Sequence, residues 1–168
     1  MDLREAFQTA LEFEQKGHDI YAATAGKTVN PIVKRTFNYL AQQEIYHIKE
    51  IKEYVKKLDD GHKVELLGDT AEQTKQFFTM TTQQFKQKTE LSNDDIKAHE
   101  TALELEQSAY DFYKEHHAQT DDADLRKFFH FLMKQENAHY EFIQKSYEFI
   151  KNPIGFYTED EKWMADGG

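Results

Sequence analysis

The sequence predicts an all-α protein, a four-helix bundle with one long crossover connection between its second and third helices. Glycine (7) and proline (2) are scarce among the 168 residues, which favours long helices over a sheet with many turns. Apolar residues recur every three or four positions in four long stretches, as on one face of a helix. The second half of the chain also repeats features of the first at an offset of 92 residues. Together these observations predict a bundle built from two similar helix pairs.

The first pair of helices is predicted over residues 3–25 and 30–58. Asp2 and Glu5 have the spacing of a capping box at the start of the first helix. Asn30 is a favourable N-cap for the second, and Pro31 suits its first helical position. The short connection makes these two helices antiparallel.

The second pair is predicted over residues 93–118 and 121–152, with Ser92 and Asp95 as a capping box and Asp121 as the cap of the last helix. Residues 59–92 form the crossover, with a short helix at about 70–88, and are long enough to make the second and third long helices parallel. We expect residues 1–152 to form the bundle domain and residues 153–168 an acidic, aromatic tail.

The composition limits the kinds of partner and compartment. A formal net charge of −10 argues against nucleic acid or an anionic membrane surface as a partner. No apolar stretch is long enough to span a membrane, and the first residues lack a signal-peptide pattern, so a cytoplasmic location is expected. Without cysteine, any metal site must use Glu, Asp and His.

Polar residues interrupt the apolar stripes of the second and fourth helices at equivalent places. Glu44 and His47 lie in the first stripe, and Glu136 and His139 lie 92 residues later in the other. Among 18 glutamates and 8 histidines, about one Glu-x-x-His pair is expected by chance, so the pairs alone mean little. The full pattern is more specific, because a further glutamate precedes each pair by 30 residues: Glu14 and Glu106.

Four carboxylates on inward faces require neutralisation, since an unpaired buried charge costs several kcal/mol. Two divalent cations would supply it, and the two histidines would add nitrogen ligands. This oxygen and nitrogen donor set suits iron or manganese, with zinc as a possible substitute. The alternative is four surface glutamates and two hydrogen-bonded core histidines. His99, on the same face as Glu106 but about 10 Å away, is expected to be such a core histidine.

The chain resembles the ferritin-like diiron carboxylate superfamily, and within it the small rubrerythrin-related proteins without a rubredoxin domain. The resemblance covers residues 3–58 and 93–152 and rests on four motifs: Glu14-x-x-Gly17-x-x-x-Tyr21, Glu44-x-x-His47, Glu106-x-x-Ala109-x-x-x-Tyr113 and Glu136-x-x-His139. The same combination of glutamates and Glu-x-x-His motifs is the general description of ferritin-like bundles.

The resemblance implies a centre of two iron ions with one histidine each, His47 and His139. Each iron would have a terminal glutamate, and two further glutamates would bridge the metals; these are Glu14 and Glu106, and Glu44 and Glu136, respectively. Tyr21 and Tyr113 would orient the terminal carboxylates through hydrogen bonds. The alternative for both tyrosines is an ordinary place in the core.

This chain differs from related families in three ways, which concern the supply of electrons, the set of glutamates and the binding of haem. Rubrerythrins carry a cysteine-rich rubredoxin domain, so here electrons would come from a separate, rubredoxin-like protein. They also have an extra glutamate where this chain has Ala109. Bacterioferritins bind haem through a methionine where this chain has Ile45, so haem is not expected.

The leading hypothesis is a diiron enzyme that reduces hydrogen peroxide or dioxygen in oxidative-stress defence. The alternatives are a ferroxidase of the ferritin type and a non-catalytic helical scaffold that binds metal adventitiously. A homodimer is expected, in which the long crossover permits exchange of helix pairs between subunits.

Overall fold

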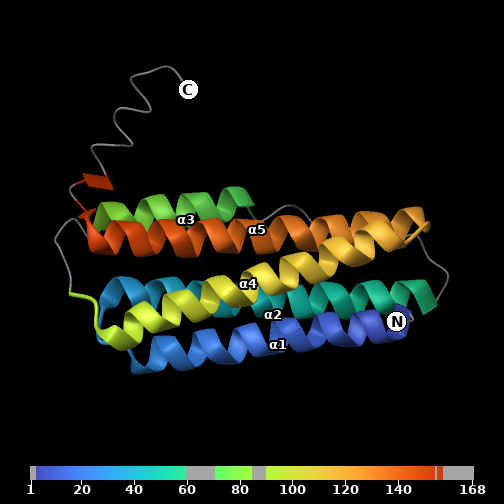
Figure 1. The fold of residues 1–168 in the computed structure, drawn as a ribbon, viewed down its shortest axis with the longest axis horizontal. Coiled ribbons are helices and arrows are strands. Elements are labelled where there is room, and N and C mark those ends of the chain that lie inside the picture. The colour runs from blue at the N-terminus through green and yellow to red at the C-terminus, as the bar shows by residue number, and fades with distance from the viewer. Residues whose placement is uncertain (1–2, 60–70, 85–89, 154, 157–168) are drawn as a thin grey trace, which may run out of the picture.

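The computed structural model describes residues 3–59, 71–84, 90–153 and 155–156 (Figure 1). Its long helices agree with the predicted ranges to within two residues at each end. The short helix of the crossover is also present. The elements in chain order are α1 (Leu3–Lys27), α2 (Pro31–Asp59), α3 (Ala71–Gln84), α4 (Asn93–Gln119) and α5 (Ala123–Lys151).

The helices form two antiparallel hairpins that lie against each other, α1 with α2 and α4 with α5. The crossover places α2 and α4 parallel, as the connection length predicted (Figure 1). Helix α3 runs back along the outside of the bundle and packs against α5. The described part of the chain is therefore an all-helical, ferritin-like bundle with one additional helix.

Side-chain caps fix the starts of the helices. Asn30 Oδ1 accepts hydrogen bonds from the amides of Ile32 (3.0 Å) and Val33 (3.1 Å), which satisfies donors that have no partner within α2. The predicted capping box of Ser92 and Asp95 is present at α4. The N-cap of α5 is Asp122 rather than the predicted Asp121. Both are aspartates, and sequence alone does not distinguish neighbouring candidates. The predicted cap at Asp2 lies outside the described residues.

The apolar core is divided into two clusters, one toward each end of the bundle. One includes Phe37, Leu40 and Ile143, and the other includes Phe7, Phe128 and Leu132. Burying such side chains stabilises each end by about 1.5–3 kcal/mol per residue. The turns between the two clusters carry the predicted polar side chains, so well-packed apolar ends hold a polar middle.

Aromatic contacts attach α3 and the end of α5 to the bundle. Phe77 stacks on Tyr39 with a centroid distance of 4.1 Å. Phe78 contacts Phe142 (5.9 Å) and Phe156 (5.6 Å) edge-on. These contacts explain why a helix rich in Thr and Gln stays on the bundle. The predicted tail from residue 157 onward lies outside the described residues.

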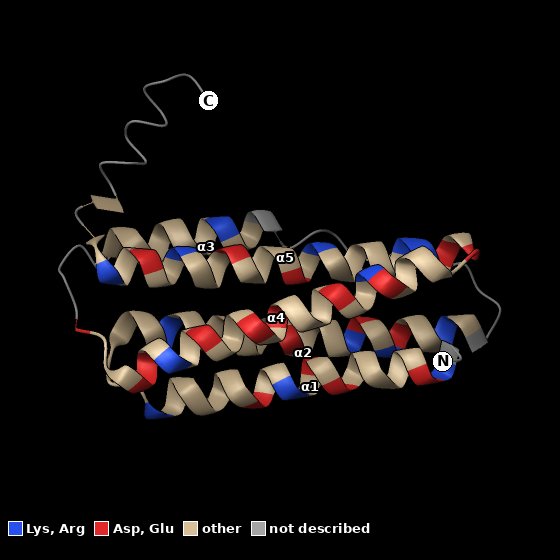
Figure 2. Cartoon of the chain, in the orientation of Figure 1, with Lys and Arg blue, Asp and Glu red and all other residues tan. Residues whose placement is uncertain are grey.

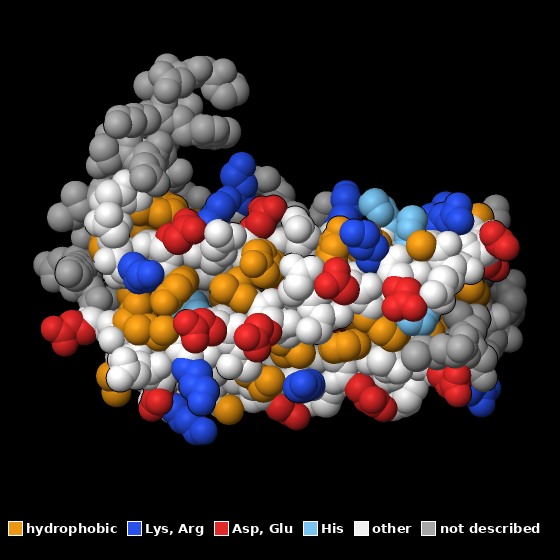
Figure 3. Space-filling view, viewed as in Figure 1, with side chains coloured by type: hydrophobic (Ala, Val, Ile, Leu, Met, Phe, Trp, Pro, Cys, Tyr) orange, Lys and Arg blue, Asp and Glu red, His pale blue; other side chains and the backbone are white. Residues whose placement is uncertain are grey.

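Charged residues are distributed along the length of the helices. Figure 2 shows acidic residues in the central turns as well as near the helix ends, and Figure 3 shows acidic and basic side chains interspersed on one face. None of the described helices combines the length and the apolar character needed to cross a membrane.

Candidate metal centre

The six predicted side chains meet at the midpoint of the bundle. Helix α1 contributes Glu14, α2 contributes Glu44 and His47, α4 contributes Glu106, and α5 contributes Glu136 and His139. Each is 0–2 % exposed. These residues occupy inward positions of helices whose neighbouring turns are apolar, so packing of the flanking turns draws the polar groups inside.

Their donor atoms form overlapping groups of the size that surrounds a metal ion. Three groups have one donor atom per residue, all within 4.8 Å of one another: Glu14, His47 and Glu136; Glu44, Glu106, Glu136 and His139; and Glu44, His47 and His139. Glu44 and Glu136 each belong to two groups. Glu14 and Glu106 each belong to one. His47 and His139 also belong to two groups each. Such overlap is what two adjacent sites with shared ligands would produce.

Both histidines direct Nδ1 toward the carboxylates. His47 Nδ1 lies 3.1 Å from Glu14 Oε2 and 3.7 Å from Glu44 Oε2. His139 Nδ1 lies 3.4 Å from Glu44 Oε1, and 3.6 Å from Glu106 Oε1. The two rings stack with a centroid distance of 5.0 Å. The histidines therefore cover one side of the carboxylate cluster as a pair.

Tyr113 and Tyr21 form hydrogen bonds with Glu14 and Glu106 in a crosswise manner. Tyr113, on the helix of Glu106, donates a hydrogen bond of 2.5 Å to Glu14 Oε1. Tyr21, on the helix of Glu14, donates one to Glu106 Oε1. Each hydroxyl thus fixes a carboxylate that belongs to the other helix pair. These contacts tie the two halves of the bundle together at the site.

The neighbouring glutamates of the cluster have pKa values that are shifted in opposite directions. Burial raises the pKa of Glu14, but hydrogen bonds with Glu44, His47 and Tyr113 outweigh burial and lower it to about 2. Burial and the neighbouring carboxylates raise the pKa of Glu44 and of Glu136 well above the usual value. Burial lowers the pKa of His47, whereas its contacts with Glu14 and Glu44 raise it, with a net result of about 9. Without a cation the cluster therefore retains protons on groups that would be ligands.

The donor atoms fit a hard or borderline divalent cation. His47 Nε2, Glu136 Oε1 and both ring nitrogens of His139 are buried without a hydrogen-bond partner. Such atoms are rare in folded proteins and require an explanation. For His139 Nδ1 and Glu136 Oε1, which point into the cluster, a bound metal ion would supply the missing interaction. Carboxylate oxygens with imidazole nitrogens, and no sulfur, suit iron, manganese or zinc.

A small cavity adjoins the cluster between α1 and α4. Its volume is about 10 Å³, enough for roughly one water-sized molecule. All four glutamates line it and neither histidine does, so it lies on the carboxylate side of the cluster. The rest of its wall consists of Phe13, Gly17, Tyr21, Leu105 and Ala109.

Sequence reasoning did not relate the small residues Gly17 and Ala109 to this cavity, which both of them line. A Cβ atom added at Gly17 would lie 3.2 Å from Glu44 Cδ and 3.3 Å from its Oε1. Ala109 is its counterpart at the offset of 92, so small side chains at both equivalent positions were a visible signal. The absence of larger side chains there leaves space next to the carboxylates.

His99 is outside the cluster, as predicted. It is fully buried, and its Nδ1 donates a 2.7 Å hydrogen bond to the carbonyl oxygen of Asp95 in the preceding turn. It stacks on Tyr147 and meets Phe37 edge-on. His99 is therefore a core residue of the bundle end.

A ferritin-like bundle with a buried glutamate and histidine cluster of this composition defines a diiron carboxylate protein. The comparison with protein families specifies the branch: the model of the rubrerythrin family matches residues 5–147. The chain belongs to the rubrerythrin family. No curated protein and no solved structure matches it.

Proposed function

We propose that this rubrerythrin-family protein reduces hydrogen peroxide at a centre of two iron ions. Glu14 and His47 would hold one iron, and Glu106 and His139 the other. Glu44 and Glu136 would lie between the two. The donor groups support this assignment. Glu136 occurs both with Glu14 and His47 and with Glu106 and His139, and Glu44 occurs with each of the two histidines. Manganese or zinc would occupy the same donor set.

The cavity on the carboxylate side is the observation that favours a small neutral oxidant. Apart from the four glutamates and Tyr21, its walls are Phe13, Leu105 and two small residues. A hydrated Fe(II) ion in transit would have to lose its water along apolar side chains, at a cost of several kcal/mol. A peroxide or dioxygen molecule carries no net charge, so it loses far less hydration free energy than an Fe(II) ion on passing these side chains. The cavity therefore favours oxidant reduction over transport of iron through the site.

The residues around the centre have separate tasks in this reaction. Two bound iron ions would supply two electrons and share the charge that develops on the oxygen atoms. Hydrogen peroxide takes up two electrons and two protons and yields two water molecules. Tyr21 and Tyr113 hold the terminal carboxylates in place, while Phe13 and Leu105 limit the access of bulk water.

We assign the return of electrons to a separate donor protein of the rubredoxin type, since none of the 168 residues is a cysteine. Oxidative-stress defence in the cytoplasm is the role proposed for the reaction.

We also propose that the protein is a homodimer, and equilibrium sedimentation measures the mass of the assembly. A monomer at micromolar concentration would contradict it.

A stopped-flow experiment tests the oxidant. Protein loaded anaerobically with two Fe(II) per chain is mixed with hydrogen peroxide or with dioxygen, and the absorption of the oxidised centre is followed. We expect peroxide to oxidise the centre much faster. The Glu44→Ala, Glu136→Ala double variant should bind little iron and give no such signal. If dioxygen is as fast as peroxide, the protein is an oxidase or a ferroxidase instead.

A further inference from the structure

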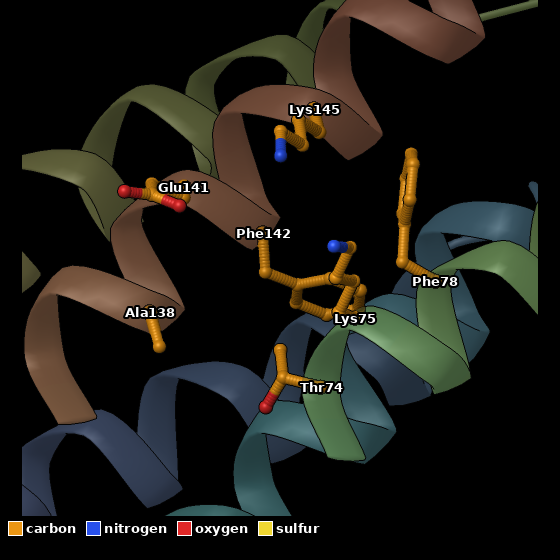
Figure 4. A pocket seen from close by; sticks show the side chains of 7 residues that line it. All are labelled: Thr74, Lys75, Phe78, Ala138, Glu141, Phe142 and Lys145. Carbon is orange, nitrogen blue, oxygen red and sulfur yellow. The ribbon is translucent and has the colours of Figure 1, made fainter. Parts of the chain in front are cut away.

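A groove runs along the outer side of α5, next to α3, away from the metal centre. Its volume is about 200 Å³, and it is lined by Thr74, Lys75, Phe78, Ala138, Glu141, Phe142 and Lys145 (Figure 4). Pockets for drug-sized ligands are larger, about 300–1,000 Å³. The space suits one large side chain with its neighbours.

The chemistry of the groove is aromatic inside and basic at the margin. Phe78 and Phe142 meet edge-on at 5.9 Å and form the apolar wall. Lys75, on α3, and Lys145, on α5, are both exposed. Glu141 is the acidic member, and its carboxylate accepts a hydrogen bond from Asn137. An occupant with an aromatic side chain next to acidic residues would match this surface.

The chain itself supplies such a segment beginning at the groove. Phe156 packs on Phe78 and on Phe149, each at a centroid distance of 5.6 Å. The next residues include Glu159, Asp160 and Glu161, followed by Trp163, the single tryptophan of the sequence. We propose that residues 157–168, which lie outside the described part of the chain, dock in this groove, with Trp163 against Phe78 and Phe142 and the acidic residues near Lys75 and Lys145.

The length of the segment permits this contact. Trp163 lies seven positions after Phe156, a distance of up to roughly 23–25 Å when the chain is extended. The groove follows α5 from Ala138 to Lys145, a rise of roughly 10 Å. The segment therefore reaches every part of the groove with slack.

Residues 157–168 of the same chain are favoured in the groove over those of a second copy, because they are covalently attached to Phe156. Because Phe156 already rests on the groove wall, the local concentration of the following residues is in the millimolar range expected for a short linker. A docked segment would cover the outer side of the turn of α5 that carries His139, between Ala138 and Phe142. The inference does not depend on the proposed reaction.

The single tryptophan permits a direct test on metal-free protein. Fluorescence of Trp163 is measured in the full chain and in a synthetic peptide of residues 157–168. In the full chain we expect emission at shorter wavelength and severalfold weaker quenching by acrylamide. The Lys75→Glu, Lys145→Glu double variant should lose most of this protection, and high salt should weaken it. A matched control, Lys16→Glu with Lys97→Glu, makes the same charge change on exposed positions of α1 and α4 and should retain protection.

Three results would overturn the inference. The first is a Trp163 in the full chain that is as accessible as in the peptide. The second is protection that is equal in the groove variant and the control, which would place the tryptophan elsewhere. The third is protection that disappears on dilution together with a dimer, which would assign the groove to the segment of a second copy.

Discussion

Replacing Glu136 by methionine should stabilise the metal-free protein and remove most of the further stabilisation that metal provides. Methionine has a similar length and no buried polar oxygen. In the metal-free protein, Glu136 Oε1 is buried without a hydrogen-bond partner, and the pKa of this carboxyl is raised by burial and by Glu14 and Glu106. Such a residue is expected where function requires a group that the fold alone does not favour.

The size of the effect follows from the unsatisfied atom. Leaving a buried polar group without a partner costs about 1–3 kcal/mol, so the metal-free variant should gain up to that amount, less the loss of the contact between Glu136 and Glu106. For a protein of this size each kcal/mol raises the melting temperature by about 2–4 °C. In the wild type, metal at one hundred times its dissociation constant adds about 2.7 kcal/mol, which the variant should largely lose.

Differential scanning calorimetry with a chelator and with Fe(II) under anaerobic conditions measures both effects. The exposed Glu100→Met serves as control and should change neither melting temperature by more than about 2 °C, since surface substitutions usually change stability by less than 0.5 kcal/mol. If the Glu136 variant melts lower than the wild type in both conditions, the carboxylate has a structural role in the fold. If metal stabilises the variant as much as the wild type, Glu136 is not a ligand.

Four further substitutions or conditions address individual contacts. Tyr113→Phe removes the hydroxyl 2.5 Å from Glu14 and should weaken metal binding by about 10–100-fold in a chelator competition, with the fold retained. Because the pKa of His47 is raised to about 9 without metal, binding must displace its proton, so metal affinity should increase as the pH is raised toward 9; an affinity that is independent of pH would exclude this ligand. Gly17→Ala places a Cβ atom 3.2 Å from a site carboxylate carbon and should slow oxidation by peroxide in stopped flow, whereas an unchanged rate would show that this cavity is not used. Hydrogen bonds from Thr28 and Ser92 outweigh burial and lower the pKa of Asp95, so its contribution to stability, about 1.5–3 kcal/mol, should be present above the unfolded value of about 3.8 and disappear as the pH falls below it; urea unfolding of Asp95→Ala at neutral and acidic pH measures this loss.

The sequence alone predicts the positions of those site residues whose direction follows from helix packing and from the internal repeat. Glu44 and His47 occupy an apolar stripe, and the same pattern recurs 92 residues later, so their inward direction follows from helix periodicity alone. Their meeting at one point follows from the length of the helices on either side. The observed cluster has both properties.

Contacts between helices were less accessible from the sequence. Spacing along α1 relates Tyr21 to Glu14, but the hydroxyl reaches Glu106 on α4 instead. Which partner a side chain reaches depends on how α1 and α4 approach each other, and no local pattern encodes that approach. The position of α3 against α5 has the same origin, because Phe77 and Phe78 reveal an apolar face but not the surface that it covers.

Two positions with small residues, Gly17 and Ala109, determine the space beside the centre. Rubrerythrins have an additional glutamate where this chain has Ala109, and Gly17 is its counterpart at the offset of 92. With small residues at both places, the α1 and α4 side of the cluster keeps a cavity that all four glutamates line. A fifth carboxylate would fill that space and add a negative charge to a cluster that already retains protons. The loss of one possible ligand and the presence of room for a small molecule therefore have the same structural cause, and the oxidant is expected on this side because the paired histidine rings occupy the other.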